Sequence, residues 1–219
     1  MILLTNQNRF AVFKHYCPNP SVIVEAGAFN GKDTIALSNH FPTASIHAFE
    51  PVPEIFNTLS QNTNHYKNVL CHQLALSDKD GKATFFVATH PKKNDKQCQA
   101  GSLLVPKERL KVSPIVYTTT ITVPTITLDR WAELNSVSQV DFLWLDLQGH
   151  ELAVLQASKK VLPSVVLLYI EVNFIQAYEQ QASYSDTNAW LAMQGFLPIA
   201  KDFVQETHFF GNVLYHQRK

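Results

Sequence analysis

The sequence predicts an α/β fold with a mostly parallel, doubly wound sheet. Apolar runs of strand length alternate with amphipathic segments of helix length, and two of these runs end in an acidic residue that leads into a glycine turn and a helix. The 219 residues contain no repeat, low-complexity tract or linker. We therefore expect residues 1–219 to form a single domain.

Each element of the first half follows from its residue pattern. The run at 21–26 is apolar and rich in β-branched residues, as in a buried strand, and the segment at 32–41 has the composition of a helix. A second strand at 44–49 and an amphipathic helix at 53–64 repeat this order, and a third strand is expected at 68–77.

The alternation of strand-length and helix-length segments stops after residue 77. A turn at 78–81, strand-like runs at 83–89 and 118–128, and a polar loop at 90–100 are typical of β-hairpin structure. We interpret this region as a small antiparallel insertion around 83–128.

The alternation returns in the second half of the chain. We expect strands at 140–147 and 165–172, helices at 149–162 and 184–194, and closing strands at 195–200 and 209–216.

The composition favours a small or neutral partner. Lys and Arg number 18, Asp and Glu number 18, and the net charge of zero argues against a nucleic-acid partner. Three cysteines without CxxC spacing predict neither a disulfide framework nor a zinc site. The first residues lack a basic region, and the richest apolar run, 161–172, contains Pro163 and Glu171. We therefore expect no secretory signal, no membrane span and a soluble cytoplasmic protein.

The strongest candidate site begins at the end of the first strand. Glu25 precedes a loop in which Gly27 and Gly31 are spaced G-x-x-x-G, a helix follows, and Glu50 ends the next strand. In a doubly wound sheet, ligands bind beyond the carboxyl ends of the strands, where a carboxylate can accept hydrogen bonds from a ribose diol. These residues predict an adenosine-containing ligand.

The loop also discriminates between ligands. It lacks the G-x-G-x-x-G spacing of dinucleotide sites, which disfavours a nicotinamide-dependent oxidoreductase. Glu25 would repel a pyrophosphate but attract an ammonium group. S-adenosylmethionine carries an ammonium group, a carboxylate and a ribose diol, and therefore matches the site. The alternative is that Glu25 caps the helix and the glycines only form a turn.

Further polar residues end two later strands. Asp146 follows one apolar run, and Glu171 and Asn173 end the next. Because the carboxyl ends of parallel strands meet at one edge of a sheet, we expect these side chains at the same rim as Glu25 and Glu50.

Ordered blocks along the chain resemble the FkbM family of methyltransferases. The blocks are EAGAFNG at 25–31, HAFEP at 47–51, ALSD at 75–78, GSL at 101–103, TLD at 127–129, VDF at 140–142, DLQGHE at 146–151 and YIEV at 169–172. The resemblance covers residues 20–216, and blocks in a shared order are more specific than any single motif. It implies a Rossmann-like class I methyltransferase fold with an antiparallel C-terminal strand. It also implies S-adenosylmethionine as methyl donor and O-methylation of a hydroxyl on a sugar or other small molecule.

The resemblance also implies which residues bind the cofactor. The loop that would hold the methionine part comprises Glu25, Gly27, Ala28, Asn30 and Gly31. The residues that would border the ribose and the adenine are Glu50, Pro51, Leu76, Ser77 and Asp78. Asp146 would lie beside the sulfonium.

The chain departs from the family pattern beside Asp146. Trp144 stands where the family commonly has a lysine, Gln148 where it has a glutamate, and His150 where it has a small residue. Asn30, where related sequences often carry an acid, is a milder change. These departures predict an unusual acceptor or weakened catalysis.

The candidate catalytic residues are Asp146, His150 and Glu171. A hydroxyl acceptor gains from a base that takes its proton, which is typically worth ~10²–10⁴-fold in rate. Alternatively, His150 only caps a helix, and Asp146 only holds the cofactor's ammonium group. Asp146, Glu171 and Asn173 are also suited to a hard cation, but their spacing carries no metal fingerprint and we predict no metal.

A second function class stays open. A degenerate methyltransferase fold would serve as a binding or interaction module without catalysis, and Trp144 and Gln148 favour it. RNA 2′-O-methylation is disfavoured by the neutral charge. The acceptor would contact polar segments such as 90–111 and 176–186, whose composition indicates no particular substrate. The residues indicate no oligomeric state.

Overall fold

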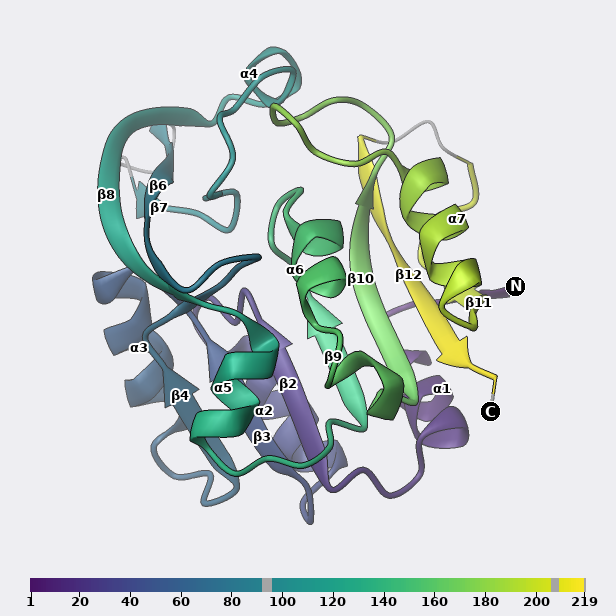
Figure 1. Ribbon diagram of the computed structural model, residues 1–219. Helices are drawn as coiled ribbons and strands as arrows, with labels where there is room; N and C mark the ends of the chain where they lie inside the picture. The colour runs from purple at the N-terminus through teal and green to yellow at the C-terminus, as the bar shows by residue number, and fades with distance from the viewer. Residues whose placement is uncertain (92–95, 206–208, 219) are drawn as a thin grey trace.

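A computed structural model describes residues 1–91, 96–205 and 209–218. Its larger sheet has eight strands in the order β1-β11-β12-β10-β9-β2-β3-β4. The strands are β1 (Ile2–Leu3), β2 (Val22–Ala26), β3 (Ser45–Phe49), β4 (Val69–His72), β9 (Phe142–Leu145), β10 (Leu167–Asn173), β11 (Phe196–Lys201) and β12 (Phe210–Gln217). Only β12 runs antiparallel to its neighbours, while the other pairings are parallel, as the arrows of Figure 1 show. The predicted doubly wound sheet with an antiparallel C-terminal strand is confirmed.

Helices cover both faces of this sheet. The helices are α1 (Arg9–Tyr16), α2 (Lys32–His40), α3 (Pro53–Thr63), α4 (Arg109–Val112), α5 (Leu128–Leu134), α6 (Glu151–Ala157) and α7 (Tyr184–Met193), with a 3₁₀ helix at Leu162–Ser164. Residues of α1 and α2 share one core cluster, whereas residues of α5, α6 and α7 share the other. Among the helices of the described residues, none has both the length and the apolar character that crossing a bilayer requires.

The alternation of side chains along β9 explains how both faces are filled. Phe142 and Trp144 pack on the α1 side, and Leu143 and Leu145 pack on the α6 side. All four are buried. A strand buried on both faces reads as a continuous apolar run, which is why this strand was predictable from sequence.

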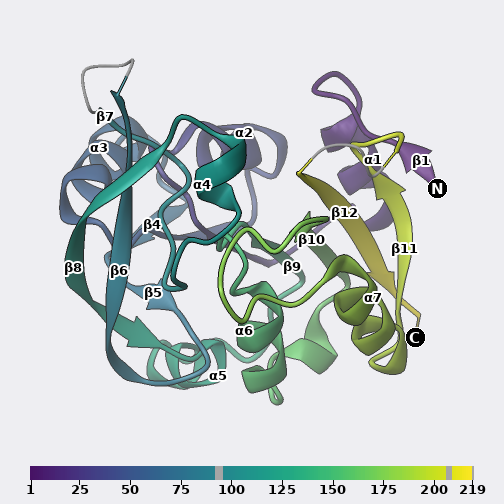
Figure 2. The same ribbon diagram turned by 90° about the horizontal axis from the view of Figure 1, so that it is seen from above.

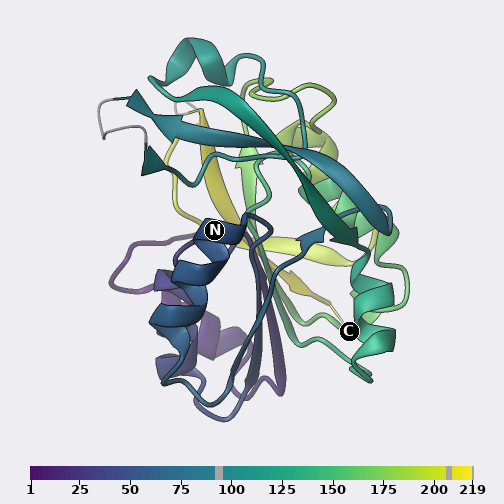
Figure 3. The same cartoon turned by 90° about the vertical axis from the view of Figure 1, so that its left-hand side faces the viewer.

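A second sheet forms the predicted antiparallel insertion. Its strands are β5 (Ala75–Leu76), β6 (Gly81–His90), β7 (Lys96–Gln97) and β8 (Val116–Ile126), in the order β5-β8-β6-β7. The long pairing of β6 with β8 is antiparallel. In Figures 1 and 3 this sheet lies above the carboxyl ends of the central strands. It therefore covers the rim where the candidate site was expected.

The third predicted strand, at 68–77, divides in two. Residues 69–72 form β4 of the central sheet, whereas residues 75–76 form β5 and pair with β8 in the second sheet. The sequence pattern could not show this division, because both pieces are apolar and the choice of partner is a long-range contact.

The N-terminal segment adds an element that the sequence pattern did not predict. β1 pairs in parallel with β11 at the edge of the sheet, and α1 packs Phe10 and Phe13 into the core. Figure 2 shows β1 and α1 beside β11 and β12, across the rim from the second sheet.

The ends of β2 and β9 meet at Gly27. Its φ is +89°, and a Cβ atom built on it would overlap the carbonyl oxygen of Asp146. The backbone N–H of Asp146 donates to the carbonyl of Ala26 over 2.9 Å. Only glycine fits this turn, because it combines a left-handed backbone with a contact that no side chain can share.

We expect Gly27→Ala to destabilise the protein strongly. The added methyl group can be accommodated only if β2 and β9 separate. Gly81→Ala is the matched control, since Gly81 also has a positive φ (+136°) but has nothing within 4 Å of a Cβ. Denaturant unfolding should give Gly27→Ala a loss larger by roughly 2 kcal/mol or more, as for other backbone clashes in a core. Equal losses for the two variants would show that the contact with Asp146 is unimportant.

Candidate functional site

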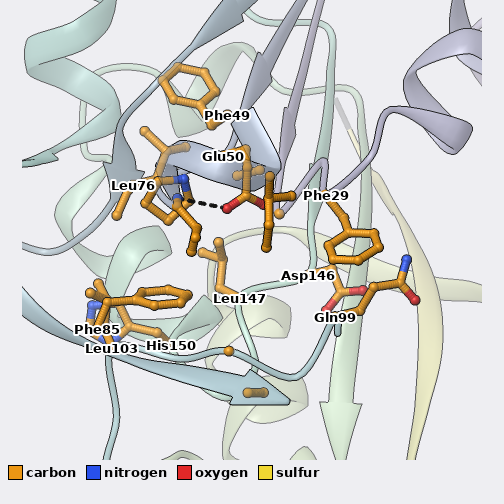
Figure 4. A pocket seen from close by; sticks show the side chains of 18 of the residues that line it. Phe29, Phe49, Glu50, Leu76, Phe85, Gln99, Leu103, Asp146, Leu147 and His150 are labelled. Atoms are coloured by element: carbon orange, nitrogen blue, oxygen red, sulfur yellow. Dashed lines mark hydrogen bonds between the residues drawn. The ribbon is translucent and has the colours of Figure 1, made fainter. Parts of the chain in front are cut away.

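Two cavities meet at Asp146 on the carboxyl-end rim of the central sheet. The first, here called the apolar cavity, contains about 660 Å³ of empty space, which includes its opening to solvent. It lies between the ends of β2, β3 and β9 and the second sheet, and Figure 4 shows the side chains that point into it. The second, here called the polar cavity, lies on the α1 side and also includes Asp146.

Glu50 is the buried acid of the apolar cavity. It ends β3 and is 5% exposed, and one carboxyl oxygen accepts a hydrogen bond from the backbone N–H of Val52 over 2.9 Å (Figure 4). Burial raises the pKa of Glu50 to about 7, against the lowering effect of hydrogen bonds from the Val52 and Phe29 backbone. A carboxylate held in this way can accept hydrogen bonds from a diol.

The walls around Glu50 are apolar. Phe49 and Leu147 come from the central strands and their loops. Leu76, Phe85 and Leu103 come from the second sheet and the loop after β7. A flat apolar slot beside a carboxylate suits a heteroaromatic base joined to a sugar.

His150 lies at the wall formed by the turn after β5. Its Nε2 is 3.2 Å from Ser77 Oγ and 3.6 Å from Asp78 Oδ1. Burial lowers its pKa, while Asp78 acts in the opposite direction. In Figure 4 His150 lies with Phe85 and Leu103, and Asp146 lies with Phe29 and Gln99. This position favours contact with the ligand over the predicted proton transfer beside Asp146.

Asp146 is held in place at the junction of the two cavities. Its Oδ1 accepts a hydrogen bond from Gln148 Nε2 over 2.7 Å. Desolvation raises its pKa to about 6, with the Gln148 hydrogen bond lowering it and Asp33 adding to the rise. The carboxylate is ionised above that pH and faces both cavities.

Asp146 belongs to a cluster of three carboxylates. Oxygen atoms of Asp146, Glu151 and Glu171 lie within 4.8 Å of one another, close enough to hold a metal ion. Glu151 takes the place that Asn173 had in the sequence-based set. Within this cluster, Gln148 Nε2 also donates to Glu171 over 3.0 Å, and backbone N–H groups of residues 147 and 149 donate to Glu151.

Glu171 is enclosed behind this cluster. Burial raises its pKa well above the usual value, and Asp146 and Glu151 raise it further. It lines neither cavity. Gln148 donates hydrogen bonds to both Glu171 and Asp146 and thereby links the two carboxyl groups. This position does not support the predicted role of Glu171 as a base at the reacting atoms.

Glu25 faces away from the apolar cavity. Its carboxyl accepts a hydrogen bond from Thr34 Oγ1 over 2.6 Å, under α2. Burial raises the pKa of Glu25 to about 8. The hydrogen bond from Thr34 lowers this pKa, whereas the nearby charges of Asp33 and Asp146 raise it further. Glu25 therefore supports the loop from beneath, and its position does not favour the predicted contact with an ammonium group.

The predicted residues fall into two groups. Those that line the apolar cavity are Gly27, Glu50, Pro51, Leu76, Asp146 and His150. Those that line neither cavity are Glu25, Ala28, Asn30, Gly31, Ser77, Asp78 and Glu171. Several of the second group shape the site: Asn30 Oδ1 accepts a hydrogen bond from the Lys32 backbone over 3.3 Å, and a Cβ on Gly31 would lie 2.9 Å from Leu59.

Apart from Asp146 and Trp144, sequence reasoning missed the residues of the polar cavity. Arg9 pairs with Asp33 at this cavity, and its guanidinium lies 5.4 Å from the ring centroid of Trp144. The apolar spacing of Phe10 and Phe13 could have predicted an amphipathic α1. No local signal pairs a residue of α1 with the first turn of α2.

Comparison with known proteins indicates a methyltransferase family. The family model described as a methyltransferase FkbM domain matches residues 25–198. A protein of Sinorhizobium fredii named 2-O-methyltransferase NoeI is 28% identical over 169 residues, which cover 75% of this chain and 68% of that protein.

Two further similarities are weaker. Methyltransferase 1 of Beauveria bassiana is 28% identical over 147 residues, covering 64% of this chain and 59% of that protein, so the match spans less than two thirds of its length. The crystal structure of the N-terminal domain of EvdMO1 with S-adenosylhomocysteine bound superposes with a TM-score of 0.55 at 14% identity, covering 99% of this chain and 83% of that one. At 14% sequence identity, this similarity shows only that the two chains share a fold.

The buried Glu25 predicts how stability depends on pH. A carboxyl group whose folded pKa is raised from 4.5 to about 8 contributes stability that is fully present at low pH and lost as the pH rises through 8. We expect the thermal midpoint of the ligand-free protein to fall between about pH 5 and about pH 8.

Glu25→Gln should flatten this decline, because it keeps an oxygen that accepts from Thr34 and removes the ionisation. Glu179→Gln, at an exposed position, is the control and should follow the wild-type curve. Parallel curves for Glu25→Gln and wild type would contradict the assignment.

Proposed function

Because this chain belongs to the FkbM methyltransferase family and uses S-adenosylmethionine as its methyl donor, we propose that it methylates a hydroxyl oxygen on a sugar or another small molecule. The supporting observation is that Glu50 and Asp146 both line one cavity at the rim of the sheet. The relative named 2-O-methyltransferase also favours an oxygen acceptor.

The apolar cavity fits the nucleoside part of the cofactor. Glu50 offers a carboxylate to the ribose diol, and the apolar walls offer a slot to the adenine. Gly27 and Gly101 allow the backbone to approach neighbouring residues closely. A Cβ on Gly101 would lie 2.6 Å from Phe85, and one on Gly27 would overlap Asp146. We assign His150 to the adenine side of this cavity.

The charged end of the cofactor would lie at the junction of the two cavities. Its ammonium group needs a carboxylate and its own carboxylate needs a cation. Asp146 and the Arg9–Asp33 pair supply these charges in the polar cavity. Arg9 Nε is buried and has no hydrogen-bond partner in the described part of the chain. We therefore propose that Asp33 and Arg9, rather than Glu25, bind the charged end of the cofactor.

The bound cofactor supplies a methyl carbon activated by the sulfonium. The protein aligns the acceptor hydroxyl with that carbon, and the second sheet covers the site and excludes water. Asp146 is the candidate base, since its pKa of about 6 leaves it ionised at neutral pH and able to take a proton.

The residues that had favoured a non-catalytic module have structural roles. Trp144 packs edge-on against Tyr169, with ring centroids 4.7 Å apart. Gln148 joins Asp146 to Glu171 and accepts a hydrogen bond from Tyr178. Neither side chain lines the apolar cavity, so neither departure removes the cofactor site.

Two measurements test the function. Calorimetric titration with S-adenosylhomocysteine should show binding, and incubation with tritiated S-adenosylmethionine should label a hydroxyl of an added monosaccharide or of a compound in fractionated host extract. Binding without transfer to any hydroxyl would contradict O-methylation but not cofactor binding.

Glu50→Ala should weaken cofactor binding. It removes charge-assisted hydrogen bonds to the ribose, worth ~1.5–3 kcal/mol, so the Kd for S-adenosylhomocysteine should rise roughly 10- to 100-fold. Glu179→Ala is the exposed control and should bind as wild type does. An unchanged Kd for Glu50→Ala would place the ribose elsewhere.

Asp146→Asn should separate catalysis from binding. If Asp146 takes the acceptor's proton, kcat should fall ~10²-fold or more, and the pH–rate profile should lose the ionisation near pH 6 that the variant lacks. A raised Kd for S-adenosylhomocysteine with an unchanged kcat would show instead that Asp146 only holds the ammonium group.

A further inference from the structure

The polar cavity extends well beyond the residues assigned to the cofactor. Its volume is about 310 Å³, at the lower end of the ~300–1,000 Å³ of ligand pockets. Its far side is formed by Trp144, Tyr169, Asp202 and Asn212. Trp144 lies on β9, Tyr169 on β10 and Asn212 on β12, and Asp202 directly follows β11. Figure 2 shows β10, β11 and β12 on the side of β9 away from the second sheet.

Strand pairing places the floor of this cavity directly beside Asp146. Trp144 of β9 pairs with Tyr169 of β10. Trp144, Tyr169 and Asp146 all line this cavity. Two aromatic rings therefore lie next to the candidate base.

Tyr169 brings a hydroxyl group to this cavity. The residue is 3% exposed. Burial raises its pKa, so the hydroxyl keeps its proton and can donate. A hydroxyl group of a ligand in the cavity can accept this hydrogen bond.

Asp202 and Asn212 form a polar wall. Asn212 donates to Asp202 from its backbone N–H over 2.7 Å and from its Nδ2 over 2.8 Å. Neither of these two hydrogen bonds uses the side-chain oxygen of Asn212. The wall thus keeps its shape and retains an acceptor for a ligand's hydroxyl.

The charges of the cavity favour a neutral ligand. Three carboxylates line it, those of Asp33, Asp146 and Asp202, against the single guanidinium of Arg9. An anionic acceptor such as a phosphate or a carboxylate would be repelled. Donors, acceptors and aromatic faces together suit a ring with several hydroxyl groups.

We propose that the far side of the polar cavity binds the methyl acceptor as a neutral polyhydroxylated ring, with one hydroxyl at Asp146. This proposal rests on the function proposed above. The acceptor oxygen bonds to the methyl carbon as the carbon–sulfur bond breaks, the electron pair stays on sulfur, and the hydroxyl proton passes to Asp146. Tyr169 and Asn212 hold the hydroxyls that do not react.

The test compares two hydroxyl deletions in the same sheet. Tyr169→Phe removes the hydroxyl in the cavity. Tyr215→Phe removes a hydroxyl on β12 that is buried in the opposite core and lacks a partner among the described residues. Acceptors are myo-inositol, D-fucose, D-glucose and D-xylose, with cyclohexanol as a ring with one hydroxyl, and tritium transfer gives KM and kcat. Calorimetry gives the Kd for S-adenosylhomocysteine.

We expect transfer to at least one polyol and little to cyclohexanol. Tyr169→Phe should raise the polyol KM roughly three- to tenfold, as for one lost hydrogen bond, and leave the cofactor-product Kd unchanged. Tyr215→Phe should change neither constant.

Three results would overturn the proposal. If Tyr169→Phe changes the Kd but not the KM, the far side belongs to the cofactor. If it changes neither, the acceptor binds elsewhere. If wild type binds S-adenosylhomocysteine but methylates none of the polyols, the acceptor class is wrong, whereas no binding at all would mean that the proposed function itself has failed.

Discussion

The close contact between Gly27 and the carbonyl of Asp146 sets the geometry of this molecule. It joins the end of β2 to the end of β9, at the point where the strand order of the central sheet reverses. Ligands of doubly wound sheets bind at this reversal. Because no side chain intervenes, Asp146 is held at the centre of the rim, and one cavity opens on each side of it. The position of the candidate base therefore follows from a backbone contact.

Placing carboxylates at this rim has an electrostatic cost. Burial raises the pKa of Glu25, Glu50, Asp146 and Glu171, since the charged form loses its hydration. Hydrogen-bond donors limit the cost: Thr34 donates to Glu25, and the Gln148 amide donates to Asp146 and Glu171. A ligand that brings a diol or an ammonium group would offer these carboxylates further donors.

The two cavities differ in polarity and therefore suit different ligand groups. The second sheet contributes Phe85 and Leu103 to the apolar cavity, which suits a nucleoside. The N-terminal segment contributes Arg9 to the polar cavity, which suits charged and hydroxylated groups. Trp144 belongs to this second environment as part of its floor. The departure of this residue from the family pattern thus lies in the cavity that we propose for the acceptor, where variation between related enzymes is expected.

The sequence by itself determined the strands and helices of the central sheet other than β1 and α1, and it indicated six residues that line the apolar cavity, Glu50 and Asp146 among them. Buried parallel strands are continuous apolar runs, and Glu50 and Asp146 stand where such runs end, so local pattern was sufficient. Only the tertiary structure decided the division of residues 68–77 between two sheets, the burial of Glu25 under α2, the place of His150 beside Ser77, and the pairing of Arg9 with Asp33. The physical reason is that each of these depends on partners distant in sequence or on the direction of a side chain, and periodicity records neither.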